Sequence, residues 1–224
     1  MTKILYMNVN LFEQEVLFEK GMSMVSAERR EKIQKFKNPM TARLSLGAGV
    51  LLKLALEESS LDGKMDQIET GVHGKPYLKH TDFHFSLSHS GHYAICAFSN
   101  APIGADLQQI KETLPKRTTR ILSDSEKEYL ENLTDIERVQ AFYRLWARKE
   151  SLIKWDGRGL HLPIEQLSFV QDGVLVDTIP FEGKLLYFRE YQDLLPQYAI
   201  CLCNEIGIFS KKIVEITAKN LKNP

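Results

Sequence analysis

The chain has 224 residues, of which 43% are hydrophobic, so it can bury a sizeable core as one large domain or as two small ones. Lys plus Arg and Asp plus Glu each number 29, so no overall charge favours binding to nucleic acid or to an anionic membrane. The three cysteines lack the paired spacing of a zinc site, and we expect no cleavable leader at the start. We therefore expect a soluble, cytoplasmic protein with reduced thiols and no membrane span.

The first half of the sequence alternates between strand and helix patterns. Ser26 is placed to cap a helix that carries several basic residues. The next helical segment is rich in Leu, Ala and Val at helical spacing. The expected elements are a strand over 2–9, helices over 26–37 and 40–58, a turn and strand over 71–78, and two strands over 83–99 joined at Ser90-Gly91.

Residues 103–108, IGADLQ, alternate strictly as a strand does. Ile103, Ala105 and Leu107 share one face, and we expect the opposite face to be wet or functional. That second face carries Gly104, Asp106 and Gln108.

The second half is predicted to begin with two helices and to end with strands. Ser123 and Asp124 open the first helix, and Gly157 and Gly159 end the second. The expected elements are helices over 123–133 and 136–155 and strands over 167–178, 184–191 and 197–204.

A short repeat relates the two halves, because Tyr-Ala-Ile-Cys at 93–96 recurs at 198–201. In both places a helix and a short strand precede the repeated strand. The repeat predicts an α+β fold of two similar α/β halves, 1–105 and 106–224, in a pseudo-twofold arrangement with a ligand site at their seam.

The segment WARKESLIK, residues 146–154, holds the strongest candidate site. On a helix, Trp146, Glu150 and Lys154 share one face. The alternative is an ordinary surface ion pair between Glu150 and Lys154. Asp106, with Gln108 beside it, could join Glu150 in binding Mg²⁺, which prefers oxygen ligands. Alternatively, Asp106 only accepts hydrogen bonds from turn amides.

The segment SLSHSG places His89 at a corner between two strands. Ser88, Ser90 and Gly91 flank it, and hydroxyls, an imidazole and turn amides together suit a phosphate. A Ser–His catalytic pair is disfavoured, because adjacent strand residues point to opposite faces. Basic residues that could converge on a terminal phosphate, or could simply be solvated, are Arg29, Arg30, Lys32, Lys35, Arg43 and Lys75.

Taken in order, GKPYL, FSLSHSG, IGAD and WARKESLIK resemble the surfactin-synthetase-activating type of 4'-phosphopantetheinyl transferase over nearly the whole chain. The resemblance implies a monomer of two similar halves that transfers 4'-phosphopantetheine from coenzyme A to a serine of a carrier protein. The other product is 3',5'-ADP, and Mg²⁺ is the cofactor.

The resemblance also implies a role for each matching residue. Asp106 and Glu150 would bind Mg²⁺, Lys154 would contact the pyrophosphate, and Glu150 is the candidate general base. The N-terminal half would hold the 3'-phosphate and adenine side of coenzyme A. The residues implied there are Arg29, Lys32, Arg43, Lys75, Pro76, Ser88 and His89.

Gln108 departs from the family pattern, in which an acid is common at that position. Its carbonyl could still bind Mg²⁺, and we expect a weaker affinity for the metal. The resemblance places carrier binding at 118–129 and 157–183, with Arg117, Arg120, Ile121 and Leu122 as candidates or as mere packing residues. Competing functions are a non-catalytic module that binds coenzyme A and an Mg²⁺-dependent phosphohydrolase. The target pathway is not encoded in these motifs.

Overall fold

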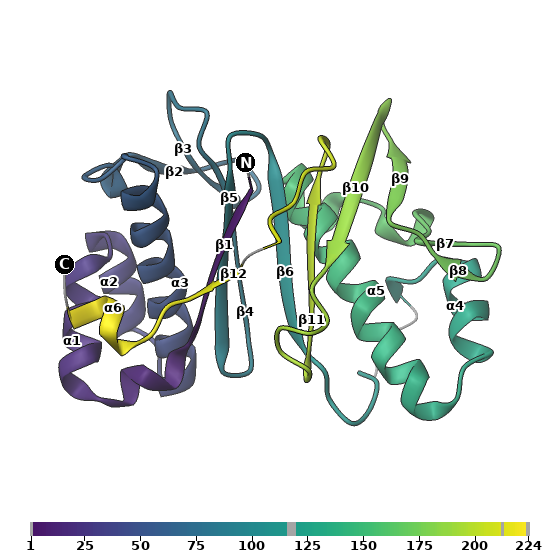
Figure 1. Cartoon of the computed structure of the whole chain (residues 1–224), viewed down its shortest axis with the longest axis horizontal. Helices are drawn as coiled ribbons and strands as arrows, with labels where there is room; N and C mark the ends of the chain where they lie inside the picture. Colours follow the sequence, from purple (N-terminus) through teal and green to yellow (C-terminus); the bar gives the residue numbers. More distant parts are fainter. Residues whose placement is uncertain (1, 116–119, 212, 223–224) are drawn as a thin grey trace. The chain divides into compact units, whose positions relative to one another are not determined.

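The computed structural model describes residues 2–115, 120–211 and 213–222, which form two compact units (Figure 1). Unit 1 contains the chain up to Gly71, residues 76–100 and the segment from Phe209 onward, and unit 2 contains residues 72–75 and 101–208. The expected boundary after residue 105 therefore differs from the observed one. It falls inside a strand of unit 2, and the C-terminal segment returns to unit 1.

Unit 1 is built on a four-stranded sheet in the order β12-β1-β5-β4. Strand β12 runs parallel to β1, and the other neighbours are antiparallel. Its strands are β1 (Lys3–Asn8), β4 (His84–Ser90), β5 (Tyr93–Ser99) and β12 (Ile213–Glu215), with a separate hairpin of β2 (Ile68–Thr70) and β3 (Pro76–Leu78). Its helices are α1 (Glu15–Met24), α2 (Ala27–Gln34), α3 (Pro39–Glu58) and α6 (Ala218–Lys222), with 3-10 turns over Val9–Glu13 and Met65–Gln67.

Helix α3 is the core helix of unit 1. Asn38 caps its start, and its Leu, Ala, Gly and Val side chains pack on β1, β4 and β5. By length and composition alone, α3 could cross a membrane, but 61% of its apolar window is buried inside the unit. The buried glycines on α3 allow close approach, since a methyl group at Gly47 would overlap the Val9 side chain. The apolar character of α3 is thus explained by the core.

Unit 2 has a similar plan, with a sheet in the order β6-β11-β10-β9 and antiparallel neighbours throughout. Its strands are β6 (Ile103–Gln109), β9 (Thr178–Phe181), β10 (Lys184–Glu190) and β11 (Tyr198–Asn204), with a small hairpin of β7 (Val170–Gln171) and β8 (Val174–Leu175). Its helices are α4 (Asp124–Glu131) and α5 (Asp135–Asp156), with 3-10 turns over Gly159–His161 and Ile164–Gln166. Capping boxes open both helices, and Gly157 ends α5 with a φ of 91°.

Helix α5 lies directly on β6, and Gly104 makes this possible. A Cβ atom at Gly104 would overlap the Ser151 carbonyl oxygen and the Trp155 backbone nitrogen. The face of β6 that carries Gly104 and Asp106 is therefore covered by α5. Of the two alternatives expected for this face, wet or functional, the wet one is wrong for Gly104 and Asp106, since both are buried.

The repeated tetrapeptides occupy equivalent places in the two sheets. Residues 93–96 open β5, which lies between β1 and β4, and residues 198–201 open β11, which lies between β6 and β10. Each strand packs under the long helix of its own unit, α3 or α5. The two units therefore share three strands and a covering helix, as the repeat predicts, but differ in the fourth strand, which is β12 beside β1 in unit 1 and β9 beside β10 in unit 2. The three cysteines are free and buried, as expected.

Candidate active site

Asp106 is the residue of the candidate site that both Gln108 and Lys154 contact in unit 2. Strand β6 points its side chain toward α5, where it is almost completely buried. The Lys154 ammonium donates to one carboxylate oxygen at 2.6 Å, and the Gln108 amide donates to the other at 2.8 Å. Lys154 thus pairs with Asp106 on the neighbouring strand, where the sequence had suggested a pair with Glu150.

Glu150 lies one helical turn before Lys154 and close enough to Asp106 for the two charges to interact. Burial raises the pKa of the Glu150 carboxyl above its usual range, and the Asp106 charge raises it further. The Lys154 charge and a hydrogen bond from Trp146 oppose this shift. The predicted grouping of Trp146, Glu150 and Lys154 on one helix face is confirmed. A pair of carboxylates of this kind, one buried and one half-buried, is suited to proton transfer or to cation binding.

The donor set fits a hard divalent cation that also uses ligands from a substrate. Within the described residues, no three His, Cys, Asp or Glu side chains gather to hold a metal by themselves. Asp106 and Glu150 supply carboxylate oxygens, and Gln108 has an amide carbonyl. Mg²⁺ is commonly held by one or two carboxylates together with water and substrate phosphates. The three predicted ligand residues are therefore chemically compatible with Mg²⁺.

Lys75 joins this unit through the end of α5. Its ammonium donates to the Trp155 carbonyl oxygen at 2.8 Å, and its side chain packs against Gly157. Burial lowers the pKa of Lys75 to about 8, although the Asp156 charge opposes the shift. The Lys75 ammonium thus lies at the C-terminal end of α5, where it contacts the residue before the last one of the helix and has a lowered pKa.

The predicted phosphate-binding cations Arg29 and Arg43 lie in unit 1, Arg29 on α2 in contact with α3 and Arg43 on α3 itself. The Arg29 guanidinium donates to the Ser45 carbonyl oxygen at 3.2 Å and packs on Gly49, and burial lowers its pKa. Arg43 pairs with Glu13 at 2.6 Å, while its buried Nε has no hydrogen-bond partner among the described residues. Arg43 therefore keeps a donor that no protein group satisfies.

His89 lies on the same face of the unit 1 sheet as α3. Its register partner is Ala94, whose side chain faces Gly47 of α3, one helical turn after Arg43. His89 is exposed at the end of β4, whereas Ser88 is buried on the opposite face of the sheet. The His89 imidazole and the Arg43 guanidinium thus lie on the α3 side of the unit 1 sheet, and the Ser88 hydroxyl lies on the opposite side.

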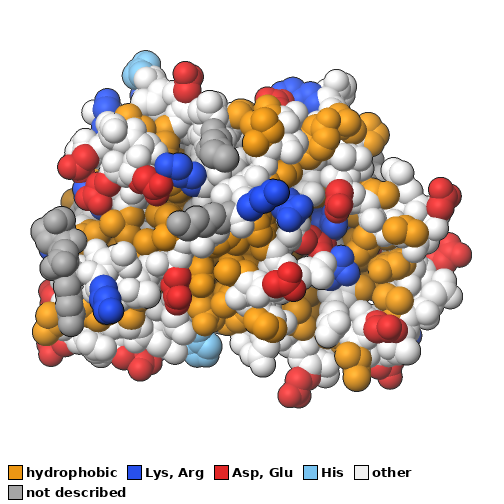
Figure 2. All heavy atoms as spheres, in the orientation of Figure 1, with side chains coloured by type: hydrophobic (Ala, Val, Ile, Leu, Met, Phe, Trp, Pro, Cys, Tyr) orange, Lys and Arg blue, Asp and Glu red, His pale blue; other side chains and the backbone are white. Residues whose placement is uncertain are grey.

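The remaining basic residues divide into structural and exposed side chains. Arg30 donates to the Met22 and Val25 carbonyl oxygens and so satisfies the end of α1. Lys32 and Lys35 are exposed on or beside α2. Charges of both signs are interspersed over the face drawn in Figure 2, as the balanced composition leads one to expect.

The residues proposed for carrier binding are only partly accessible. Arg120 is exposed and Ile121 is partly buried, but Leu122 is packed in the core of unit 2. Leu122 therefore cannot present its side chain to a partner in this conformation. Arg117 lies outside the described residues.

Sequence reasoning gave no role to Lys149, although it stands next to Glu150. The Lys149 side chain is 1% exposed and pairs with the fully buried Glu126 of α4 at 2.9 Å. Its ammonium also donates to the Ile164 and Leu167 carbonyl oxygens, each at 2.7 Å. Lys149 therefore fixes the far side of α5 to α4 and to the segment that follows α5.

Comparisons with known proteins agree with this arrangement. A family model described as the 4'-phosphopantetheinyl transferase superfamily matches residues 102–203, and one described as 4'-phosphopantetheinyl transferase, N-terminal, matches residues 13–101. The chain therefore belongs to the 4'-phosphopantetheinyl transferase superfamily.

Individual relatives point to one branch of that family. The chain is 32% identical over 221 residues to 4'-phosphopantetheinyl transferase Sfp of Bacillus subtilis, covering 97% of each protein. It is 29% identical to 4'-phosphopantetheinyl transferase gsp of Aneurinibacillus migulanus, covering 73% of this chain and 69% of the relative. A human L-aminoadipate-semialdehyde dehydrogenase-phosphopantetheinyl transferase is 27% identical over 65% of this chain and 52% of its own length. The chain is of the Sfp type, as its motifs predict.

Proposed function

We propose that this protein transfers 4'-phosphopantetheine from coenzyme A to a serine hydroxyl of an apo carrier protein, releasing 3',5'-ADP. The observation that carries the proposal is the contact of Asp106 with Lys154 and Gln108, with the raised pKa of Glu150 beside it. Family membership gives the transferred group, and these contacts supply the acid-base and charge chemistry that the transfer needs.

The reaction forms a bond from the serine oxygen to the β-phosphorus and breaks the bond from that phosphorus to the bridging oxygen. Glu150 accepts the serine proton, and its pKa, raised by burial and by the Asp106 charge, makes it a better base than an exposed carboxylate. The Lys154 ammonium lies against Asp106 and is positioned to stabilise negative charge on the leaving 3',5'-ADP. Positioning and electrostatics supply most of the rate in phosphoryl transfer.

Asp106 and Glu150, with the Gln108 carbonyl, would hold Mg²⁺. When bound, the ion neutralises charge on the pyrophosphate. In its absence, the side chains of Gln108 and Lys154 hold the Asp106 carboxylate in a fixed position.

The cations of unit 1 would bind the 3'-phosphate of coenzyme A. Arg43 has a buried, unsatisfied Nε, and His89 lies on the same face of the sheet. Arg29 of α2 supplies a half-buried guanidinium that contacts α3, and Lys32 is exposed on α2. Arginine suits a terminal phosphate because its guanidinium can make two parallel hydrogen bonds. Lys75 and Pro76 would contact the adenine side, and Ser88 would contribute through its backbone.

A mass-spectrometric assay tests the function directly. The protein is incubated with coenzyme A, Mg²⁺ and several apo carrier proteins, and the carriers are examined for gain of the phosphopantetheine arm. We expect wild type to modify at least one carrier, and Asp106→Ala and Glu150→Ala to abolish the modification while remaining folded. Failure of wild type on every carrier contradicts the proposal.

The same assay separates the alternative functions. A phosphohydrolase would break down coenzyme A without modifying a carrier, and a binding module would leave both unchanged. Omitting Mg²⁺ tests the metal requirement separately. We also propose that the enzyme is a monomer, as the family resemblance implies, and that it is cytoplasmic, which its three free, buried cysteines support.

A further inference from the structure

Two histidines outside the transferase motifs lie side by side in unit 2. His73 is in the turn before β3, and His161 is the last residue of the 3-10 turn that follows α5. The centres of their rings are 5.2 Å apart, and the ring planes are inclined at 53°. The backbones also come close, since a Cβ atom built on Gly159 would lie 3.9 Å from the His73 carbonyl oxygen. Both side chains are exposed, so a solute can reach the pair from solvent.

The backbone of each histidine is fixed by a neighbouring residue. Lys75, two residues after His73, donates to the Trp155 carbonyl oxygen at 2.8 Å. Leu162, the residue after His161, is buried in the core of unit 2, and its backbone N–H closes the 3-10 turn. Side chains on a fixed backbone lose less conformational entropy on binding a common ligand than side chains on mobile loops. The two imidazoles are therefore preorganised for a shared ligand.

The separation of the two rings is that of two imidazoles bound to one tetrahedral metal ion. A Zn–N bond of about 2.1 Å places the ion roughly 3.2 Å from the centre of each imidazole, and two such rings at the tetrahedral angle have centres roughly 5.2 Å apart. His73 and His161 show this separation. Aromatic contacts without a metal cover a broader range, about 4.5–7 Å.

The chemistry of the ligands selects the kind of ion. Imidazole suits Zn²⁺, Ni²⁺ and Cu²⁺, whereas Mg²⁺ prefers oxygen ligands. In the part of the chain that the structure describes, no third His, Cys, Asp or Glu completes a cluster with the pair. We propose that His73 and His161 together bind one divalent transition-metal ion, for which Zn²⁺ is the probe, with water as the remaining ligands. The ion would join residues 72–75 to the segment after α5.

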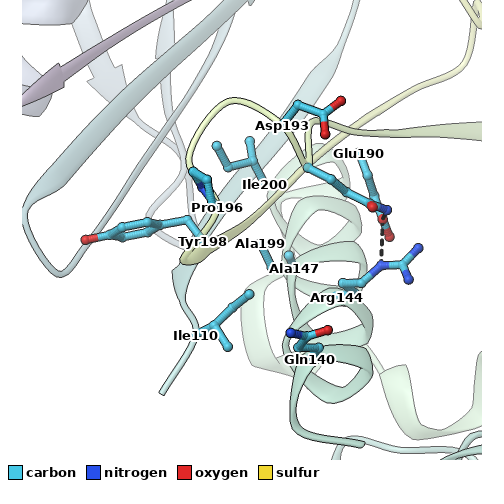
Figure 3. A pocket seen from close by; sticks show the side chains of 11 residues that line it. Ile110, Gln140, Arg144, Ala147, Glu190, Asp193, Pro196, Tyr198, Ala199 and Ile200 are labelled. Carbon is cyan, nitrogen blue, oxygen red and sulfur yellow. Dashed lines mark hydrogen bonds and ion pairs between the residues drawn. The ribbon is translucent and has the colours of Figure 1, made fainter. Parts of the chain in front are cut away.

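The cavity of unit 2 does not offer such an ion a competing site. Its volume is about 370 Å³, and it lies where α5 meets β11 (Figure 3). The Glu190 carboxylate in its wall already accepts hydrogen bonds from Arg144 at 2.8 Å and from Arg148 at 2.6 Å. Gln192 donates a further hydrogen bond to Glu190 at 2.7 Å. The two guanidinium groups repel a divalent cation, and Asp193 is then the other carboxylate of the lining.

Calorimetric titration with Zn²⁺ in the presence of excess Mg²⁺ tests the proposal. We expect wild type to bind one Zn²⁺ per chain, and His73→Ala and His161→Ala each to raise the dissociation constant at least about tenfold. His80→Asn is the matched control, because His80 is also exposed and its φ of 53° is tolerated by Asn. The control should keep the wild-type dissociation constant.

The folded protein is titrated because thermal unfolding would expose the three buried cysteines, which would themselves bind Zn²⁺. Asp106→Ala separates the histidine pair from the carboxylates proposed for Mg²⁺, and it should bind Zn²⁺ as wild type does. Loss of Zn²⁺ binding in Asp106→Ala would assign the ion to those carboxylates and overturn the proposal. Absence of binding in wild type, or unchanged dissociation constants in both histidine variants, would also overturn it.

Hydrogen exchange provides an independent measurement of the bridge between the two segments. Zn²⁺ should slow amide exchange both in residues 72–75 and in residues 159–161 of wild type, and in neither segment of His73→Ala or His161→Ala. Slower exchange in one segment alone would mean that a single histidine holds the ion, which contradicts a shared site. None of these measurements depends on phosphopantetheine transfer, so their outcome is independent of the proposed function.

Discussion

The Gln108 side chain positions Asp106, because its amide donates a hydrogen bond to one carboxylate oxygen of Asp106 at 2.8 Å. Gln108→Glu replaces that hydrogen bond with repulsion between the buried Asp106 carboxylate and a half-buried one at position 108. We expect the metal-free protein to lose about 1–3 kcal/mol of unfolding free energy and the half-saturating Mg²⁺ concentration for transfer to fall. Urea unfolding without metal and a Mg²⁺ titration of the activity measure the two effects.

The neighbouring Gln109 provides a matched control, since it lies on the opposite face of β6. Gln109→Glu should change neither the metal-free stability nor the Mg²⁺ dependence by a comparable amount. An unchanged half-saturating concentration in Gln108→Glu would show that this position has no influence on metal affinity.

The lowered pKa of Lys75 predicts that the unfolding free energy of the protein depends on pH. Its pKa is about 8 in the folded protein, against an ordinary lysine pKa of 10.5. Between these two pKa values the unfolded chain binds more protons than the folded protein does, so the unfolding free energy rises with pH. Below about pH 8, Lys75 is charged in both states and the full cost of burying the cation is present. Lys75→Met should therefore stabilise the protein by about 1–3 kcal/mol near neutral pH.

That gain should shrink as the pH rises from about 8 to about 10, which urea unfolding across the range would measure. If Lys75 also contacts the nucleotide, the same variant should bind coenzyme A more weakly. A gain that is independent of pH would mean that the charge of Lys75 has no part in the effect.

At the scale of elements, the buried pair of Lys149 and Glu126 joins α5 to α4. Removing one partner leaves the other as an uncompensated buried charge, so Lys149→Met should cost about 3–5 kcal/mol of unfolding free energy. Adding Glu126→Gln should recover part of that loss. A double-mutant cycle in urea measures the coupling, and strictly additive costs would show that the two side chains act independently.

Elements with strong local signals could be predicted from the sequence, and those that depend on distant contacts could not. Ser26 caps α2 and Gly157 ends α5 as expected. Helix α1 was not predicted: Gln14 makes no side-chain cap, and Gly21 interrupts the pattern. A methyl group at Gly21 would meet Phe12, so packing accounts for that glycine. Strand β12 was also missed, because only three residues pair with β1 from the far end of the chain.

For the candidate site, too, local patterns could be predicted from the sequence and distant contacts could not. Alternation and helical spacing were enough to place Asp106, Glu150 and Lys154 as candidates. They could not show that Lys154 pairs with Asp106, because that contact joins a strand to a helix far along the chain. Lys149 and Glu126 look like surface charges in the sequence, and only their burial reveals a structural pair.

At the scale of the whole molecule, unit 1 depends on residues that follow unit 2 in the chain. Ile216 and Leu221 are buried in the core of unit 1, and β12 covers the edge of β1. Truncation after Ile208 should therefore destabilise unit 1 by about 3–6 kcal/mol and leave unit 2 largely unaffected. Hydrogen exchange at the amides of β5 and β11 would compare the two units directly.

Truncation after Thr217 is the graded control, because it keeps β12 and removes α6 with Leu221. It should cost unit 1 less than the longer deletion. If the amides of β5 and β11 lost protection from hydrogen exchange equally, the C-terminal segment would not stabilise unit 1 selectively.

The return of residues 213–222 to unit 1 also sets an order for folding during synthesis. Domains usually fold from the N-terminus as the ribosome releases them. Here unit 2 has all its strands once Ile208 has emerged, whereas the sheet of unit 1 still lacks β12. The unit that is translated first is therefore completed last, and until then β1 remains an open sheet edge at which a nascent chain can mispair.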